Sequence, residues 1–306
     1  MTTWPTPRRI IVPIDISTAS EQAIPFATML AGPGDEIVLL HVVTAPDRMR
    51  MGRPGQPAVE HIHEQLYDAG AVYLRGLADE MPLPEGVTVG TRVVDGPAAD
   101  QIVAYAKGAN ASLIVMTTAG RGAAGRLAFG SVADQVARTA AIPVVLVRLR
   151  DRNLLTAPPH LERVLVPLDG SDRATRALEP AAKVAKQLNL PVTVMYVMEI
   201  SDLSAVYGTT LSPSVMTELV RVEDEAVRES LNQAAESLKA AGVRASWKIL
   251  SGGWAGQEIE DEVTPSDFVV MASHGRGGVR RWLFGSVAER LVRAGRSPVM
   301  LVPSID

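Results

Sequence analysis

Residues 9–17 read Arg9-Ile-Ile-Val-Pro-Ile-Asp15-Ile-Ser17, and residues 163–171 read Arg163-Val-Leu-Val-Pro-Leu-Asp169-Gly-Ser171. The two stretches lie 154 residues apart and are identical at five of nine positions. In each, a run of branched apolar residues precedes an aspartate, a pattern typical of a buried strand that ends in a loop. The sequence therefore contains a repeat, and each copy begins with a strand.

A second pair of similar stretches lies towards the end of each copy. Residues 120–147 align with residues 275–302, and 14 of the 28 aligned pairs are identical. A unit of about 155 residues is much longer than a solenoid repeat and has the length of a whole domain. The polar stretch 151–160 separates the copies. We therefore expect two domains in the 306-residue chain, 1–154 and 155–306.

Short β-branched runs alternate with longer amphipathic stretches in each half. Apolar residues recur at helical spacing over 62–73 and 220–238. Strands are expected at 10–14, 37–43, 87–94, 113–116 and 143–147, and again at 164–168, 192–197, 243–250, 268–271 and 299–302.

The order of these elements predicts the fold. The strand runs show little alternation, which indicates strands buried on both faces. Strand–helix–strand units require right-handed crossovers. The fold class is therefore α/β, with an open, doubly wound, five-stranded parallel sheet in each half and helices on both faces. Pro25 lies inside the first expected helix and indicates a late start or a kink.

The composition excludes several classes of protein. With 30 basic and 34 acidic residues the formal net charge is −4, so no overall positive field favours nucleic acid. The lack of cysteine excludes disulfides, thiolate nucleophiles and cysteine-ligated zinc. No run of about 18 apolar residues indicates a membrane span, and the N-terminus lacks the apolar stretch of a signal peptide. We expect a cytoplasmic protein that has no membrane partner.

Two aspartates mark the place where such sheets bind ligands, beyond the carboxyl ends of the strands where the strand order reverses. Asp15 and Asp169 end the first strands, and Ser17 and Ser171 are placed to cap the helices that follow. Each aspartate either caps backbone N–H groups alone or also contacts a ligand, and the residues leave both interpretations open.

A glycine-rich segment leads from the fourth expected strand into a helix. It begins at Gly120 and ends at Gly130-Ser131, and its copy runs from Gly275 to Gly285-Ser286. Glycine lets the backbone approach a ligand, and a helix that begins with Gly-Ser offers open N–H groups to an anion. The pattern predicts a phosphate-binding segment, and the alternative is an exposed turn with solvated arginines.

Other catalytic and metal-binding motifs are missing or incomplete. No P-loop occurs and neither glycine segment contains lysine, so rapid nucleotide hydrolysis is not expected. His61 and His63 are two residues apart on an expected helix and face different ways, which disfavours a metal pair. We assign no catalytic residue and no metal ligand.

Together, these residues resemble the universal stress protein family in its tandem two-domain form. Nucleotide-binding members of that family carry an aspartate at the end of strand one and the motif G-x2-G-x9-G-[ST] after strand four. The two glycine segments match the last three positions of the motif. Thr117 and Ala272 replace the leading glycine, and their Cβ atoms narrow the space beside the ligand.

The resemblance implies an adenine nucleotide α-hydrolase-like fold and ATP as the ligand, with ADP or AMP as alternatives and Mg²⁺ on the phosphates. The aspartates would contact the adenosine, the valines would line the base pocket, and the glycine segments would bind the phosphates. Carried over by position, the first site would comprise Pro13, Ile14, Asp15, Val42, Met116, Thr117, Gly120, Arg121, Gly130, Ser131 and Val132. The second would comprise Pro167, Leu168, Asp169, Val197, Met271, Ala272, His274, Gly275, Arg276, Gly285, Ser286 and Val287.

The resemblance also implies a regulatory protein partner and a two-fold interface between fifth strands. In a tandem chain this pairing would give an intramolecular pseudo-dimer, and a homodimer is the alternative. The expected function is that of an ATP-binding stress-response regulator or sensor. A ligand-free interaction module, which the replaced glycines favour, and a slow ATPase are the alternatives.

Overall fold

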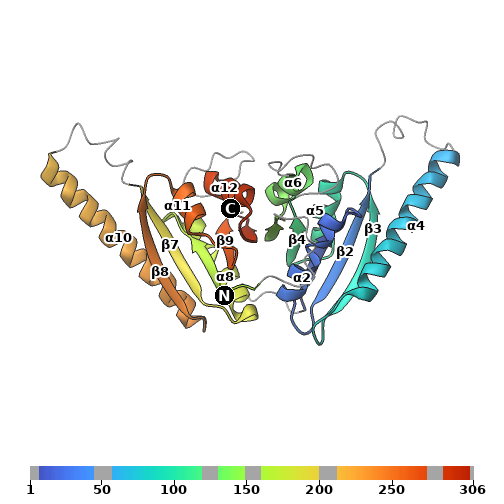
Figure 1. The fold of residues 1–306 in the computed structure, drawn as a ribbon, viewed down its shortest axis with the longest axis horizontal. Coiled ribbons are helices and arrows are strands. Elements are labelled where there is room, and N and C mark those ends of the chain that lie inside the picture. Colours follow the sequence, from blue (N-terminus) through green and yellow to red (C-terminus); the bar gives the residue numbers. More distant parts are fainter. Residues whose placement is uncertain are drawn as a thin grey trace. The chain divides into compact units, whose positions relative to one another are not determined.

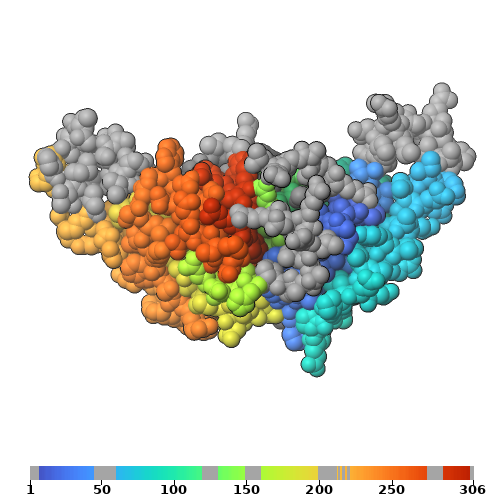
Figure 2. Space-filling model, viewed as in Figure 1, coloured from blue at the N-terminus to red at the C-terminus, as the bar shows by residue number. Residues whose placement is uncertain are grey.

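The computed structural model describes residues 7–44, 57–118, 130–148, 160–199, 212–273 and 285–303. The chain divides into two compact units, Met1–Pro158 and Pro159–Asp306. The described residues of the first unit run from blue to green in Figures 1 and 2, and those of the second run from yellow-green to red.

Strands and helices alternate along both units. The first unit contains β1 (Arg9–Pro13), α1 (Thr18–Glu21), α2 (Ile24–Leu30), β2 (Glu36–Val43), α4 (Pro57–Glu80), β3 (Thr88–Asp95), α5 (Ala98–Gly108), β4 (Leu113–Thr117), α6 (Ser131–Thr139) and β5 (Val144–Val147). The second contains β6 (Arg163–Pro167), α7 (Asp172–Thr175), α8 (Leu178–Leu188), β7 (Val192–Glu199), α10 (Pro213–Ala240), β8 (Ala245–Gly252), α11 (Ala255–Glu262), β9 (Asp267–Ala272), α12 (Ser286–Ala294) and β10 (Val299–Val302). Every expected strand is present, and no strand end differs from the expected one by more than two residues.

Both units have the same parallel strand order. It is β3-β2-β1-β4-β5 in the first unit and β8-β7-β6-β9-β10 in the second. Neighbouring strands within each unit pair in parallel. The chain winds from β1 outward to β3 and then returns to β4 on the other side of β1, which confirms the α/β doubly wound fold. The strand order therefore reverses between β1 and β4, and between β6 and β9.

Helices cover both faces of the strands in each unit (Figure 1). In the first unit α4 lies against β2 and β3, and its Gly70 permits this approach because a Cβ there would lie 2.7 Å from the Cδ2 of His41. The Tyr73 hydroxyl of α4 donates a hydrogen bond to Glu21 of α1. Helix α5 packs against α6 on the opposite face.

The core lies around the central strands. All five residues of β4 and all four residues of β5 are buried. The expectation that every strand is buried on both faces is wrong for β3 and β8, most of whose residues are half-buried or exposed. Both strands lie at the end of the strand order and have a neighbouring strand on one side only.

Pro25 divides the first helical segment in two. Helix α1 ends at Glu21, and Pro25 lies in the first turn of α2, where its missing N–H needs no acceptor. The proline therefore marks a break between two helices, and of these only α2 starts late. Among the residues that the structure describes, no helix is both long and apolar enough to cross a membrane.

Candidate functional site

The first candidate site begins where β1 ends. Half-buried Asp15 accepts a hydrogen bond from the Ser17 hydroxyl, and its backbone N–H donates to the Ser20 hydroxyl oxygen at 3.2 Å. Ser17 in turn caps α1, because its Oγ accepts from the Ser20 backbone N–H at 3.2 Å. A carboxylate has lone pairs for several donors, so these bonds leave Asp15 able to accept from a ligand hydroxyl as well.

The second unit repeats this arrangement at the end of β6. The Asp169 carboxylate accepts from the Ser171 backbone N–H at 2.9 Å and from the Ser171 hydroxyl at 2.6 Å. Ser171 caps α7 by accepting from the Ala174 backbone N–H at 3.2 Å. In both units the aspartate therefore orients the serine that caps the next helix.

The residue between aspartate and serine turns the chain through a left-handed conformation. Its φ is 58° at Ile16 in the first unit and 77° at Gly170 in the second. Glycine adopts this conformation freely, whereas a β-branched side chain is strained in it. The turn is thus the same in both units, although only the second unit has a glycine at this position.

A glycine begins the helix that follows the fourth strand of each unit. The Gly130 backbone N–H donates to the Thr118 carbonyl at 2.8 Å, and the Gly285 N–H donates to the Ser273 carbonyl at 3.1 Å. A Cβ at Gly130 would lie 2.8 Å from that same Thr118 oxygen. Because the φ of Gly130 is an ordinary −61°, glycine is required here for space rather than for backbone freedom.

These glycine-started helices have open amino ends, unlike α1 and α7. No side chain of the described residues caps α6 or α12. Within the described part of the chain, the first three N–H groups of each helix, at 131–133 and 286–288, have no hydrogen-bond acceptor. Three aligned N–H donors and the positive end of the helix dipole can bind an anion such as a phosphate.

The acidic residues in the first turns of these helices are already paired. Asp134 forms an ion pair with Arg138 at 2.7 Å, and Glu289 forms one with Arg293 at 2.8 Å. Each carboxylate is paired with the arginine four residues later in the same helix. This pairing reduces the repulsion that the carboxylate would exert on a bound anion.

The remaining predicted residues line the same strand ends. The Ile14 backbone N–H donates to the Leu40 carbonyl at 2.8 Å, and the Leu168 N–H donates to the Met195 carbonyl at 2.8 Å. These bonds continue the strand pairing past Pro13 and Pro167. Val42 is half-buried, whereas Val197 is buried.

Thr117 and Ala272, at the motif position of the leading glycine, end β4 and β9 and are each 7% exposed. Met116 and Met271 precede them and are also buried. Gly120, Arg121, His274, Gly275 and Arg276 lie outside the described residues.

His41 is a residue of the first site that the sequence motifs do not identify. Its Nδ1 lies 2.8 Å from the Ile14 carbonyl oxygen, and because a carbonyl can only accept, Nδ1 carries the proton. The buried ring thereby fixes the backbone just before Asp15. Tyr196 precedes Val197 in the second unit as His41 precedes Val42, so the repeat itself gives no signal at this position.

The paired histidines of α4 have separate partners. The Nε2 of His63 lies 3.2 Å from a carboxylate oxygen of Asp95, whereas the Nε2 of His61 lies 3.2 Å from the side-chain nitrogen of Gln65. In the described ranges no group of three or more histidine, aspartate or glutamate residues is arranged to hold a metal ion.

Comparisons with known proteins agree with this doubled architecture. The model of the universal stress protein family matches residues 6–148 and again residues 160–303. A universal stress protein of Methanocaldococcus jannaschii is 30% identical over 142 residues, which are 46% of this chain and 81% of that protein. One from Mycolicibacterium smegmatis is 26% identical over 301 residues and covers 96% of both chains.

Among solved structures, the crystal structure of a universal stress protein from Archaeoglobus fulgidus has the same fold. Its TM-score is 0.66 at 20% identity, and the match covers 98% of this chain and 100% of that one. Two matches of the family model, one in each unit, account for nearly all of the sequence. The chain therefore belongs to the universal stress protein family and carries the family domain twice.

Proposed function

We propose that each unit binds an adenine nucleotide at the carboxyl ends of its strands, and that the protein acts as a stress-response regulator or sensor. The observation that carries this proposal is the pair of open helix ends at α6 and α12, which face the reversal of strand order in each unit. Membership of a stress-response family supports the regulatory role.

The residues present suit a nucleotide. The N–H groups at 131–133 and 286–288 would bind its phosphates, and Asp15 and Asp169 would accept hydrogen bonds from its ribose hydroxyls. Gly130 keeps the amino end of α6 within hydrogen-bond distance of the end of β4. A Mg²⁺ ion brought in on the phosphates would neutralise part of their charge.

A ligand-free interaction module is the second candidate function. The observation that favours it is the burial of Thr117 and Ala272, whose side chains stand where the nucleotide-binding motif has glycine. The third alternative is a slow ATPase in which Asp15 or Asp169 positions water or a metal ion, and no observation on the described residues specifically favours it.

Substitution of the two helix-start serines tests the nucleotide hypothesis. Ser131→Asp with Ser286→Asp places a carboxylate at the first position of α6 and α12, where it favours the helix dipole but repels phosphate. Ser131→Ala with Ser286→Ala is the matched control, which keeps the N–H groups. ATP at about 100 times its Kd should stabilise the wild type by about 2.7 kcal/mol.

The expected result is a thermal shift with ATP in the wild type and in the alanine variant, and none in the aspartate variant. Mass spectrometry of small molecules released from denatured wild-type protein would identify a co-purified nucleotide. No shift in the wild type at millimolar ATP and no released nucleotide would reject the proposal and favour the interaction module. Turnover of ATP that persists equally in the aspartate variant would exclude hydrolysis at these sites.

A further inference from the structure

A groove of about 530 Å³ lies in the first unit beneath α5, apart from the candidate nucleotide site. It runs from Arg9 and Glu36, the first residues of β1 and β2, to Val94 near the end of β3, and its lining includes neither Asp15 nor the start of α6. Its other polar lining residues are Arg92 of β3 and Gln101 and Tyr105 of α5.

The strand register explains why these side chains meet. Arg9 pairs with Glu36, and Glu36 pairs with Thr88, so Arg92 lies on the same face as both because side chains alternate along a strand. Gly90 lies between Thr88 and Arg92 on this face, and a Cβ there would come within 3.1 Å of a Glu36 carboxylate oxygen. The missing side chain at Gly90 leaves space beneath the helix.

The two arginines of the groove differ in their partners. The Arg9 Nε donates to Glu36 at 2.6 Å, and its Nη1 donates to the Ala109 carbonyl at 2.5 Å. Tyr105, which lines the groove together with Arg92, is the main cause of the raised pKa of the exposed Arg92 side chain. No carboxylate of the described residues lies within 4.0 Å of the Arg92 guanidinium. The groove therefore has two cations and one anion.

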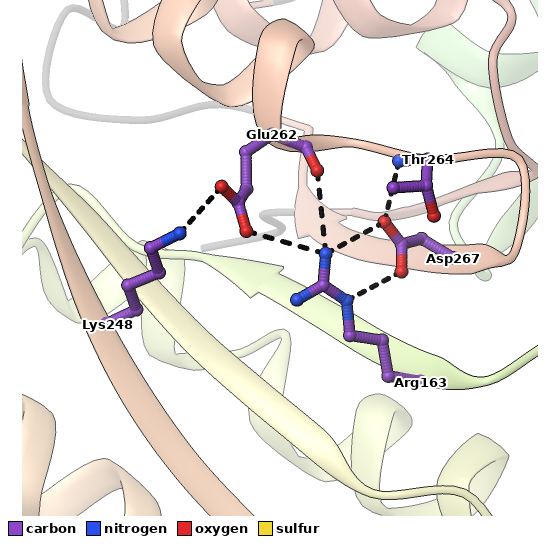
Figure 3. Close-up of polar contacts among 5 residues, drawn as sticks. All are labelled: Arg163, Lys248, Glu262, Thr264 and Asp267. Carbon is purple, nitrogen blue, oxygen red and sulfur yellow. Dashed lines mark hydrogen bonds and ion pairs between the residues drawn. The ribbon is translucent and has the colours of Figure 1, made fainter.

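In the second unit the corresponding basic residues are neutralised (Figure 3). Arg163, the counterpart of Arg9, contacts Asp267 at 2.7 Å and Glu262 at 3.5 Å. Lys248, the counterpart of Arg92, contacts Glu262 at 2.7 Å. Asp267 also accepts from the Thr264 backbone N–H at 2.7 Å. Two cations and two carboxylates balance there.

Three substitutions between the repeats account for this difference, and one of them places Glu36 where the second unit has Pro191. Tyr105 and Glu262 each lie three residues after a buried isoleucine, Ile102 and Ile259, so they occupy equivalent positions on α5 and α11. Ser112 precedes β4 at the place where Asp267 begins β9, and its buried hydroxyl has no hydrogen-bond partner among the described residues. The first unit thus has neutral residues, Tyr105 and Ser112, at the positions of the acidic Glu262 and Asp267.

We propose that the groove of the first unit binds a small molecule through a phosphate or carboxylate group held by Arg92. A guanidinium presents a planar fork of donors that matches either oxyanion, and Arg92 and Tyr105 line the groove together. Glu36 disfavours a highly charged ligand. The groove volume falls within the range of about 300–1,000 Å³ of small-molecule sites, so the ligand extends beyond the anionic group itself.

The test is a heteronuclear NMR titration of the full chain with inorganic phosphate and, separately, with succinate. It is carried out in the Ser131→Asp, Ser286→Asp variant, so that phosphate binding at the helix ends does not contribute. The expected result is a saturable shift of the Arg92, Gln101 and Tyr105 signals with at least one probe. A saturable shift with phosphate alone identifies the bound group as a phosphate, and one with succinate alone identifies it as a carboxylate. The absence of a saturable shift with either probe overturns the proposal.

Variants of the two units provide the controls. Tyr105→Glu copies the second unit by placing a carboxylate beside Arg92, and it should weaken binding at least tenfold, as should Arg92→Gln. Lys248→Gln removes the equivalent cation of the second unit and should leave the affinity unchanged. Equal affinity in Arg92→Gln and its parent, or an equal loss in Lys248→Gln, would overturn the assignment to this groove.

Discussion

Among single residues, the one in the left-handed turn after each site aspartate differs between the two units: it is Ile16 in the first and Gly170 in the second. A β-branched residue in this conformation costs about 1–2 kcal/mol relative to glycine. We expect Gly170→Ile to lower the free energy of unfolding by about that amount. Ile16→Gly should cause little loss, because relief of strain at φ 58° offsets the removal of a half-buried side chain. Urea denaturation of both variants measures this, and equal destabilisation by the two changes would contradict it.

His41 shows what single residues of the sequence do not reveal. Its hydrogen bond to the Ile14 carbonyl joins β2 to the turn that carries Asp15, across 27 residues of chain. No local pattern predicts such a contact, because it depends on the pairing of β1 with β2 and on the absence of a side chain at Gly70.

At the scale of elements, the start of α6 depends on one close approach. The sequence predicts the helix start because Gly130-Ser131 precedes an amphipathic stretch. The structure adds the reason for glycine, which is the Thr118 carbonyl rather than the backbone angle.

Gly130→Ala should therefore displace α6 from the end of β4. Overpacking of this kind costs about 1–3 kcal/mol of stability, and we expect at least a tenfold loss of nucleotide affinity as the N–H groups move. Calorimetric titration with ATP and a thermal melt measure the two effects. Ser131→Ala is the control, since it leaves the backbone in place; an affinity of Gly130→Ala equal to that of this control would refute the explanation.

At the scale of the whole molecule, the relation between the two units is the main prediction that stays open. Among the described residues of each unit, β5 pairs with β4 alone and β10 pairs with β9 alone, so each unit has an apolar edge strand. Such edges require a partner strand or a cover. The family resemblance implies that β5 and β10 pair within one chain.

Spin labels can test this pairing because the chain has no cysteine of its own. Gln135→Cys and Arg290→Cys place labels at equivalent positions on the exposed sides of α6 and α12. We expect a mass near 32.6 kDa by light scattering and a single narrow label-to-label distance in dilute solution. A broad distance distribution at that mass would indicate independent units, and twice the mass would indicate a homodimer.

The repeat, the order of strands and helices along the chain, and the residues that begin α6 and α12 can all be predicted from the amino-acid sequence. These features are local, because hydrophobic periodicity and glycine positions act over a few residues. Three features emerge from the folded chain alone: β3 and β8 lie at edges, His41 supports the Asp15 turn, and Arg9, Arg92 and Tyr105 line one groove. Strand register and helix packing join residues far apart in the chain, and no local pattern records which residues will share a face.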